Sequence, residues 1–243
     1  MAKDSQVERE FGVPFPGRIL APERWTRTAW KNLPVAGPID WAALFGRTAP
    51  LVLDLGCGNG RFIIGSSVAR PEFNHVGLDI LPVVIRYATR RANQRGLRNV
   101  RFAVRGAFEF LGDLVAPHTV REIHVYHPQP FHDVQKAYRR LITPEFMALI
   151  HRSLEPGGQF VVQTDNVVYW RYIRDTAPHF FDFQERPGAW PDTPLGRTRR
   201  EIIARRQGLK IFRGLGTPLT ELDEPRIAEL VRNLPLPKFE TGM

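Results

Sequence analysis

Short apolar runs alternate with amphipathic segments from residue 51 to residue 164. Five of the runs have the length and residue types of strands, and they span residues 51–55, 75–80, 100–104, 122–126 and 159–164. The clearest helical pattern lies at 82–95, where proline stands in the first turn and apolar residues recur at helical spacing: Val83, Val84, Tyr87, Ala88 and Ala92. Strands that alternate with helices are typical of βαβ units, so the pattern predicts a mainly parallel sheet.

The later part of the chain adds further elements. A long helical region is predicted at about 133–154, interrupted near Thr143 and Pro144 because proline disfavours an unbroken helix. The segment Glu155-Pro156-Gly157-Gly158 ends it and turns the chain into the fifth strand. We also predict a helix at 166–175 and strands at 180–184 and 209–213.

Composition divides the chain into three parts. Residues 1–45 are rich in proline and aromatic rings, which indicates an N-terminal extension that packs its rings onto a domain. The alternating pattern fills a main domain at 46–216, and residues 217–243 are expected to form a C-terminal tail.

Other features exclude whole classes of protein. No apolar run reaches the roughly 18 residues that a membrane helix needs, and the polar start shows no secretory signal, so we expect a cytoplasmic protein with no membrane contact. The single cysteine, Cys57, cannot form an internal disulfide or a multi-thiolate metal site.

The net charge of +9 is concentrated in two stretches. Residues 86–105 contain seven arginines and no acidic residue, and residues 186–213 contain eight basic and two acidic residues. Such stretches favour a polyanionic partner such as RNA, although solvated helix faces would have the same composition.

A glycine-rich turn follows the first predicted strand and precedes a helix. This arrangement is the usual small-ligand site at the carboxyl end of a parallel sheet. A dinucleotide fingerprint that starts at Gly56 or Gly58 would need glycine at position 61 or 63, where Arg61 and Ile63 stand. The spacing D-x-G-x-G-x-G instead resembles the first motif of S-adenosylmethionine-dependent methyltransferases, with these residues: Asp54, Gly56, Gly58 and Gly60.

Two carboxylates fit that cofactor. Asp54 precedes the turn and suits a cationic ligand, because the amino group and the sulfonium of S-adenosylmethionine are both positive. Asp79, at the end of the second strand and next to Ile80, could accept hydrogen bonds from the ribose hydroxyls. An acid at that place also occurs in dehydrogenases.

Several successive blocks resemble the bacterial tRNA (guanine-N7-)-methyltransferase family over about residues 51–213. The blocks are LVLDLGCGNGRFIIGSSVARPEFNHVGLDI, RGLRNVRF, HPQPFHDVQKAYRRLITPEF, SLEPGGQFVVQTDNVVYW and TRREIIARRQGLKIFR. The resemblance implies an α/β fold of the S-adenosylmethionine-dependent methyltransferase (Rossmann-like) type, with a mainly parallel seven-stranded sheet and helices on both faces. It also implies tRNA as the partner and methyl transfer to N7 of a guanine.

The resemblance assigns roles to individual residues. It implies catalytic positions at Gln129 and Asp165, and cofactor contacts at Ile80, Gly106 and Ala107 in addition to the turn and its two carboxylates. It implies contacts with the substrate at a further set: Asp165, Thr198, Glu201, Lys136, Arg139 and Arg140.

Three positions depart from the family pattern. Gln129 stands where the family has aspartate in Pro-Asp-Pro-Trp, Asp133 replaces a lysine, and Gly106 replaces an acid near the adenine. Three functions therefore stay open: an RNA methyltransferase, a non-catalytic or retargeted RNA-binding protein that holds the cofactor, and a nicotinamide oxidoreductase. The sequence does not distinguish a monomer from a homodimer.

Histidines and aromatic residues near the later strands have simpler interpretations. His124 and His127 are an odd number of residues apart on a strand and point to opposite faces, so no metal site is predicted from them and His132. Tyr169, Trp170 and Tyr172 could stack on a base, but we expect two of the three to pack in the core.

Overall fold

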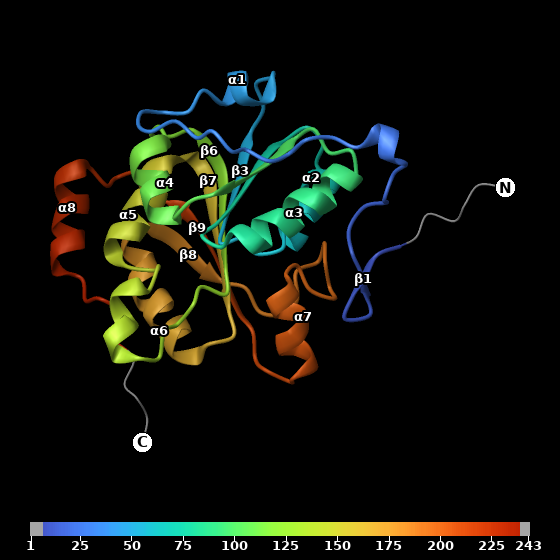
Figure 1. The fold of residues 1–243 in the computed structure, drawn as a ribbon. Helices are drawn as coiled ribbons and strands as arrows, with labels where there is room; N and C mark the ends of the chain where they lie inside the picture. Colours follow the sequence, from blue (N-terminus) through green and yellow to red (C-terminus); the bar gives the residue numbers. More distant parts are fainter. Residues whose placement is uncertain (1–6, 239–243) are drawn as a thin grey trace.

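The computed structural model describes residues 7–238 as a central sheet with helices on both faces (Figure 1). The strand order is β5 (Val100–Val104), β4 (Asn74–Asp79), β3 (Leu51–Leu55), β6 (Val120–Tyr126), β7 (Leu154–Thr164), β9 (Phe212–Pro218) and β8 (Phe181–Glu185). Strands β3 to β7 pair in parallel, whereas β9 is antiparallel to both β7 and β8. The prediction of a mainly parallel seven-stranded sheet is confirmed.

Helices cover both faces of this sheet. The helices are α1 (Trp41–Phe45), α2 (Arg61–Ala69), α3 (Pro82–Gln94), α4 (Ala107–Leu114), α5 (Pro144–Ser153), α6 (Val167–Thr176), α7 (Arg199–Arg206) and α8 (Glu224–Asn233). In Figure 1, α2 and α3 lie on one side of the sheet and α4 and α5 on the other, with α8 outside α5. The short elements are β1 (Arg9–Glu10), β2 (Val13–Pro14), η1 (Pro22–Arg24), η2 (Val134–Arg139) and η3 (Ala177–His179).

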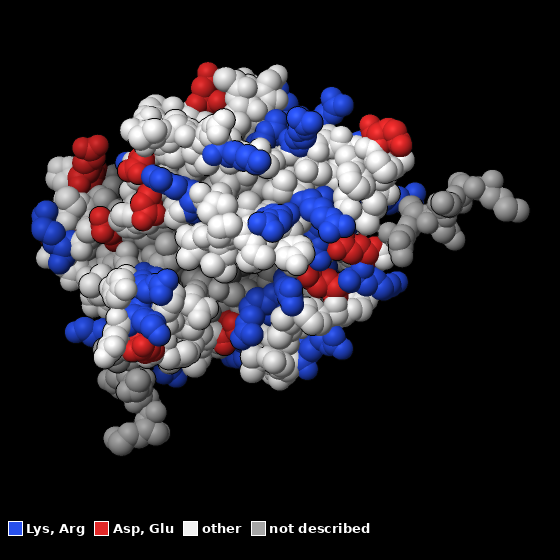
Figure 2. All heavy atoms as spheres, viewed as in Figure 1, with Lys and Arg blue, Asp and Glu red and all other residues white. Residues whose placement is uncertain are grey.

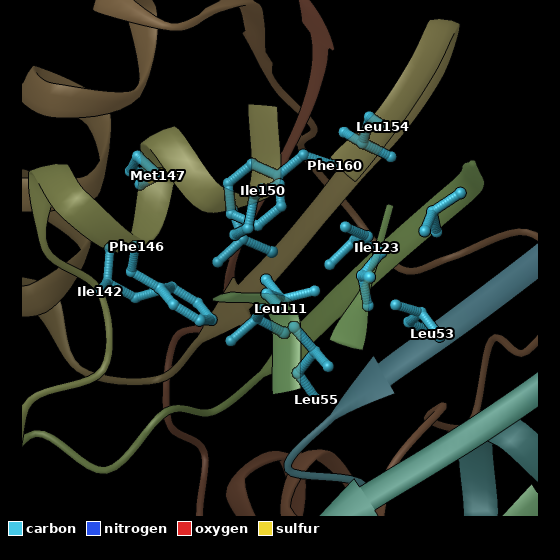
Figure 3. Close-up of a cluster of buried hydrophobic side chains, with 14 of the residues drawn as sticks. Leu53, Leu55, Leu111, Ile123, Ile142, Phe146, Met147, Ile150, Leu154 and Phe160 are labelled. Atoms are coloured by element: carbon cyan, nitrogen blue, oxygen red, sulfur yellow. The ribbon is translucent and has the colours of Figure 1, made fainter. Parts of the chain in front are cut away.

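The core forms because side chains alternate between the two faces of each strand. In β3, Leu53 and Leu55 belong to the larger cluster on the α4 and α5 side, whereas Val52 belongs to the cluster on the α2 side. Figure 3 shows Leu53 and Leu55 close to Leu111 and Ile123 within the larger cluster. A fully buried leucine contributes about 1.5–3 kcal/mol, so this cluster fixes the sheet on which the carboxyl-end loops are carried.

The N-terminal segment packs its rings against helix α4 and pairs with the edge strand β5. Ala29 forms an isolated parallel bridge with Phe102 on the edge strand β5. The ring of Trp30 meets Phe110 edge-on at 6.2 Å, and the ring of Trp41 lies 6.4 Å from Phe110. This segment therefore extends the β5 side of the molecule.

Two predicted patterns need correction. Strand β9 does not end at residue 213 but runs from Phe212 to Pro218. Glycine is unfavourable in strands, yet a Cβ at Gly214 would lie 2.2 Å from the ring of Phe183 on β8, so close packing requires glycine here. In α3, Val83 and Tyr87 are more than half exposed, and the buried residues are Ile85, Ala88 and Ala92.

The region 133–154 contains two separate elements. The 3-10 helix η2 ends at Arg139, and α5 begins at Pro144. The Thr143 hydroxyl accepts a hydrogen bond from the Phe146 amide at 3.1 Å. Proline at this position therefore starts the second helix instead of interrupting a long one.

The described part of segment 217–243 is attached to the main sheet domain. Helix α8 packs against α5, and the Tyr172 hydroxyl donates to the Pro235 carbonyl at 2.9 Å. As predicted, two of the three aromatic residues of α6, Tyr169 and Trp170, are buried in the core. No helix within residues 7–238 is long and apolar enough to cross a membrane.

Candidate active site

The glycine turn connects β3 to α2 at the carboxyl edge of the sheet. Gly56, Gly58 and Gly60 have φ angles of 84°, 53° and 79°, in the left-handed region that favours glycine. The amides of Gly56 and Cys57 both donate to the Leu78 carbonyl, which fastens the turn to β4. A Cβ added at Gly56 or Gly58 would meet nothing within 4 Å, so the turn faces open space.

Asp54 lies just before this turn and is 2% exposed. Its Oδ1 atom has no hydrogen-bond partner among the described residues. Burial raises the pKa of this carboxyl well above its usual range, and the nearby charge of Asp79 raises the pKa further. A buried carboxylate without a partner is unfavourable, so the site suits a ligand that brings a positive charge.

Asp79 lies at the end of β4 in a different environment. Its Oδ2 accepts from the Gly58 amide at 3.0 Å, and its Oδ1 accepts from the Leu81 amide at 2.9 Å. Each carboxylate oxygen retains acceptor capacity, which two ribose hydroxyls could use. Ile80 is 60% exposed beside it and offers an apolar surface to a purine ring.

Gly106 and Ala107 mark the start of α4 after β5. A Cβ at Gly106 would lie 2.0 Å from Oε2 of Glu109, so the carboxylate of Glu109 occupies the space beside this glycine. An acid is therefore present at this edge although residue 106 itself is glycine. The residues at the ends of β3, β4 and β5 together fit S-adenosylmethionine.

A second cavity opens at the carboxyl ends of β6 and β7. Its volume is about 450 Å³, and its lining combines ring, amide, carboxylate and guanidinium groups: His127, Pro128, Gln129, Pro130, His132, Thr164, Asp165, Asn166, Arg200 and Leu209. The structure thus brings the two predicted catalytic positions, Gln129 and Asp165, to one cavity.

Asp165 is held from two sides within this cavity. Its Oδ1 lies 2.9 Å from His127 Nδ1, and its Oδ2 accepts from Arg200 at 2.5 Å. Partial burial disfavours the charged form, but the hydrogen bonds from His127 and Arg200 outweigh it and lower the pKa of Asp165 below its usual range. The cavity therefore contains a carboxylate that stays ionised.

A buried chain of polar contacts continues behind Asp165. His127 Nε2 lies 2.8 Å from Gln163 Nε2, and Gln163 Oε1 accepts from Trp190 at 2.6 Å and from Arg213 at 2.9 Å. Because the Gln163 amide nitrogen can only donate, His127 Nε2 accepts, and Nδ1 carries the proton toward Asp165. Sequence analysis missed His127 and Gln163 as site residues, and their spacing of 36 residues gave no signal.

Known proteins with similar sequences identify the family of this chain. A family model described as "Putative methyltransferase" matches residues 48–213. A tRNA (guanine-N(7)-)-methyltransferase of Saccharophagus degradans is 30% identical over 193 residues, which cover 74% of this chain and 82% of the relative. The enzyme of that name from Rubrobacter xylanophilus is 33% identical over 221 residues, covering 86% of this chain and 91% of the relative. This chain belongs to the tRNA (guanine-N(7)-)-methyltransferase family.

Solved structures with a similar fold are also methyltransferases. The 16S rRNA methyltransferase KamB superposes with a TM-score of 0.56 at 19% identity, covering 79% of this chain and 98% of that one. A 16S rRNA (adenine(1408)-N(1))-methyltransferase from Catenulisporales acidiphilia gives a TM-score of 0.53 at 17% identity, covering 79% and 96%. At these identities the likeness shows the fold alone, and the predicted Rossmann-like fold is confirmed.

Two residues that the family resemblance assigns to the substrate, Thr198 and Glu201, make their contacts within the protein. Thr198 caps α7, where its hydroxyl accepts from the Glu201 amide at 3.0 Å. Glu201 is fully buried; it accepts from Arg213 at 2.6 Å and from the Arg197 amide at 2.8 Å. Both side chains hold α7 in place behind the cavity, and we propose that they position Arg200.

The basic residues after the Gln129 loop differ from one another in burial and in contacts. Arg140 is buried and donates to the carbonyls of Pro130 and Phe131 at 2.8 and 2.7 Å, so it holds the loop that carries Gln129. Phe131 has a φ of 44°, in the left-handed region, and these bonds stabilise that conformation. Lys136 and Arg139 are exposed on η2, where Lys136 pairs with Asp133 at 3.3 Å and Arg139 lies over the Phe131 ring at 5.1 Å.

Two of the three histidines singled out in the sequence, His127 and His132, line the same cavity, whereas His124 lies elsewhere. His124 lies 3.0 Å from Glu122 and 2.9 Å from the Tyr126 hydroxyl on the α2 side of the sheet, whereas His127 contacts Asp165. Within residues 7–238 no group of three or more histidine, cysteine, aspartate or glutamate residues could hold a metal ion.

Proposed function

We propose that this chain transfers a methyl group from S-adenosylmethionine to N7 of a guanine in tRNA. The observation that carries the proposal is the pair of adjoining sites at the carboxyl edge of the sheet. One has the buried Asp54, whose Oδ1 has no partner among residues 7–238, behind an open glycine turn, and the other has Gln129 and Asp165 in one cavity. Membership of the tRNA (guanine-N(7)-)-methyltransferase family supports both assignments.

The first site holds and orients the cofactor. S-adenosylmethionine supplies a methyl group activated by its sulfonium when it is bound. Asp54 meets the ammonium of its amino acid end, directly or through water, and the glycine turn lets the chain approach closely. Asp79 accepts from the ribose hydroxyls, and Ile80 contacts the adenine. These contacts fix the direction in which the methyl group points.

The second site holds the guanine. N7 of guanine has a lone pair in the ring plane and attacks the methyl group without losing a proton, so the chain need not provide a general base. Catalysis then depends on in-line positioning and on stabilising the positive charge that develops on the purine. Asp165 supplies negative charge because its pKa is lowered, and Gln129 offers a neutral amide to the guanine edge.

Arg200 connects the guanine site to the RNA backbone. Its guanidinium pairs with Asp165 but is half exposed, on the basic helix α7. Figure 2 shows lysine and arginine side chains over the region where α3 and α7 are drawn in Figure 1. A tRNA that follows these side chains reaches the cavity from the carboxyl edge of the sheet. We also propose that the reaction takes place in the cytoplasm.

Methyl transfer to a defined tRNA tests this function. An unmodified tRNA transcript is incubated with the chain and methyl-labelled S-adenosylmethionine, and nucleosides are identified by mass spectrometry after digestion. We expect 7-methylguanosine, and a transcript in which 7-deazaguanine replaces guanine should accept no label because it lacks N7. Asp165→Asn should slow transfer by roughly tenfold or more through lost charge stabilisation. Label in another nucleoside would contradict the assignment to N7.

A further inference from the structure

A groove lies beside the cofactor site, next to the segments that carry Ile80 and Gly106. It lies between the N-terminal segment, α3 and the edge strand β5, with a volume of about 670 Å³. Its lining combines rings with three cations: Trp25, Ala29, Trp30, Lys31, Leu33, Pro82, Ile85, Arg86, Thr89, Arg90, Asn93, Phe102 and Val104. No carboxylate is among these lining residues, so the groove has a net charge of +3.

The arginines of α3 and of its C-cap, Arg95, divide into two groups. Arg95 and Arg91 donate to the carboxylate of Glu8 at 2.8 Å and stack on the Phe15 ring at 4.7 and 4.4 Å, so their charges are used within the protein. Arg86 and Arg90, one turn apart, are exposed and have no hydrogen-bond or ion-pair partner within residues 7–238. Only this second pair faces the groove.

The aromatic wall of the groove is held in place. Trp25 is 44% exposed, and its indole nitrogen donates to the Leu20 carbonyl at 2.9 Å. An exposed ring fixed in this way presents a flat surface with little further loss of conformational entropy on binding. A base can stack on such a ring, because every base has a π face.

We propose that this groove binds an unpaired nucleotide of the tRNA substrate, with its base on Trp25 and the neighbouring phosphates at Arg86, Arg90 and Lys31. The inference rests on the proposed function. Stacking and phosphate contacts together are what the lining supplies, and a purely apolar partner would leave three cations uncompensated.

The groove reads a part of the RNA other than the target guanine. It borders β5, whereas the guanine cavity lies at β6 and β7, three and four strands away in the sheet. At about 4.8 Å between neighbouring strands, the strands that border the two sites are roughly 14–19 Å apart. A nucleotide held in the groove therefore helps to select the tRNA without contacting the reacting base.

Binding of an unmodified tRNA transcript in the presence of S-adenosylhomocysteine tests the groove without any methyl transfer. Trp25→Ala should weaken tRNA binding by about tenfold through lost stacking, and Trp25→Phe should restore most of it. Combined Arg86→Ala and Arg90→Ala should lower the slope of log K against log salt by roughly 1–2. The matched control, Arg226→Ala with Arg232→Ala on α8, should leave the slope unchanged.

The outcomes separate the groove from the proposed function. If the chain binds tRNA through the groove but methylates no guanine, the groove proposal stands and the proposed function is wrong. If the chain methylates N7 and Trp25→Ala binds tRNA with the affinity of the parent, the proposed function stands and the groove proposal is wrong. A loss of affinity in Trp25→Ala that Trp25→Phe does not restore would assign Trp25 to folding of the N-terminal segment and overturn the stacking. Failure to bind tRNA overturns both.

Discussion

Two carboxylates beside the glycine turn have different properties because their surroundings differ. Asp54 is buried, and one of its carboxylate oxygens has no hydrogen-bond partner among the described residues. Both oxygens of Asp79 accept hydrogen bonds from backbone amides. Burial raises the pKa of Asp54, and a cation that reaches this carboxyl favours its charged form. We therefore assign the ammonium of the cofactor to Asp54 and its neutral hydroxyls to Asp79.

Binding of S-adenosylhomocysteine, which keeps that ammonium, should release protons from Asp54. The cation favours the charged carboxylate, so the bound state holds fewer protons than the free state, and affinity rises with pH. Calorimetry in buffers of different ionisation enthalpy, at several pH values above the ordinary pKa of aspartate, measures this release. Asp54→Asn should abolish the release and weaken binding, while Asp79→Asn should weaken binding and retain the release. Equal proton release in both variants would contradict the assignment.

The neutral side chain of Gln129 limits the rate of the proposed reaction, because it carries no negative charge to stabilise the developing purine cation. It is exposed in the cavity and has no hydrogen-bond partner within residues 7–238. Gln129→Asp should increase methyl transfer to N7 by roughly tenfold, because a second carboxylate stabilises the developing purine cation by about 1.4 kcal/mol. The rate constant at saturating tRNA measures this effect.

The nearby Asp133 provides a control for the same prediction. A neighbouring carboxylate raises the pKa of a new one and reduces its charge. Asp133 also caps η2 by accepting from the Gln135 amide at 3.0 Å, so Asp133→Asn removes the charge and keeps an acceptor there. The double variant should transfer the methyl group faster than Gln129→Asp alone. If both variants are slower than the parent, the loop does not hold the guanine.

At the scale of the element, α7 depends on a buried ion pair. Glu201 is fully buried and pairs with Arg213 of β9, whereas Glu229 and Arg226 form a similar pair exposed on α8. Removing one partner of a buried pair leaves the other charge uncompensated. Glu201→Gln should therefore lower the free energy of unfolding by about 3 kcal/mol, measured by urea denaturation.

The exposed pair on α8 supplies the matched control. Glu229→Gln should change stability by less than about 1 kcal/mol, because solvent screens that pair. Thr198→Ala, which removes the cap of α7, should fall between the two at about 1 kcal/mol. Parent stability in Glu201→Gln together with lost tRNA affinity would instead indicate direct contact of Glu201 with the substrate.

The elements that could be predicted from sequence are those with local signals. The strand, glycine turn and helix around Gly58 follow one another in the chain, and their bounds agree closely with the prediction. Strand β9 was misplaced because Gly214 has low strand propensity, and only the Phe183 ring on the neighbouring strand explains it. Propensity thus failed where packing between distant segments decides the residue.

At the scale of the whole molecule, the sequence predicted the charge but not how it is used. The arginines in the stretch 86–105 have no distinguishing local pattern, yet Arg91 and Arg95 both pair with Glu8 of the N-terminal segment, and Arg91 also pairs with Glu10. The contact of His127 with Asp165 likewise joins residues 38 positions apart. Such pairs join segments that are far apart in the chain, and no local pattern encodes them. The site could therefore be located from the sequence, whereas its ion pairs and hydrogen bonds could be seen only in the fold.

The strand order also buries ionisable groups whose titration should affect the whole fold. His75 on β4 is fully buried between Ser66 and Asn99, and burial lowers its pKa from 6.5 to about 3. The unfolded chain takes up this proton below pH 6.5, and the folded chain excludes it until about pH 3. The stabilisation is therefore complete above pH 6.5 and is lost as the pH falls across that window.

Between pH 7 and pH 5 this single residue should cost about 2 kcal/mol of the free energy of unfolding, since each pKa unit corresponds to about 1.4 kcal/mol. Urea denaturation at both pH values measures the loss. His75→Gln cannot titrate but can still bond Ser66, so its loss should be smaller than that of the parent by about 2 kcal/mol. The remainder comes partly from His124, whose pKa burial lowers to about 4. An identical loss in parent and variant would show that solvent reaches His75, and the core around β4 would then be looser than its packing indicates.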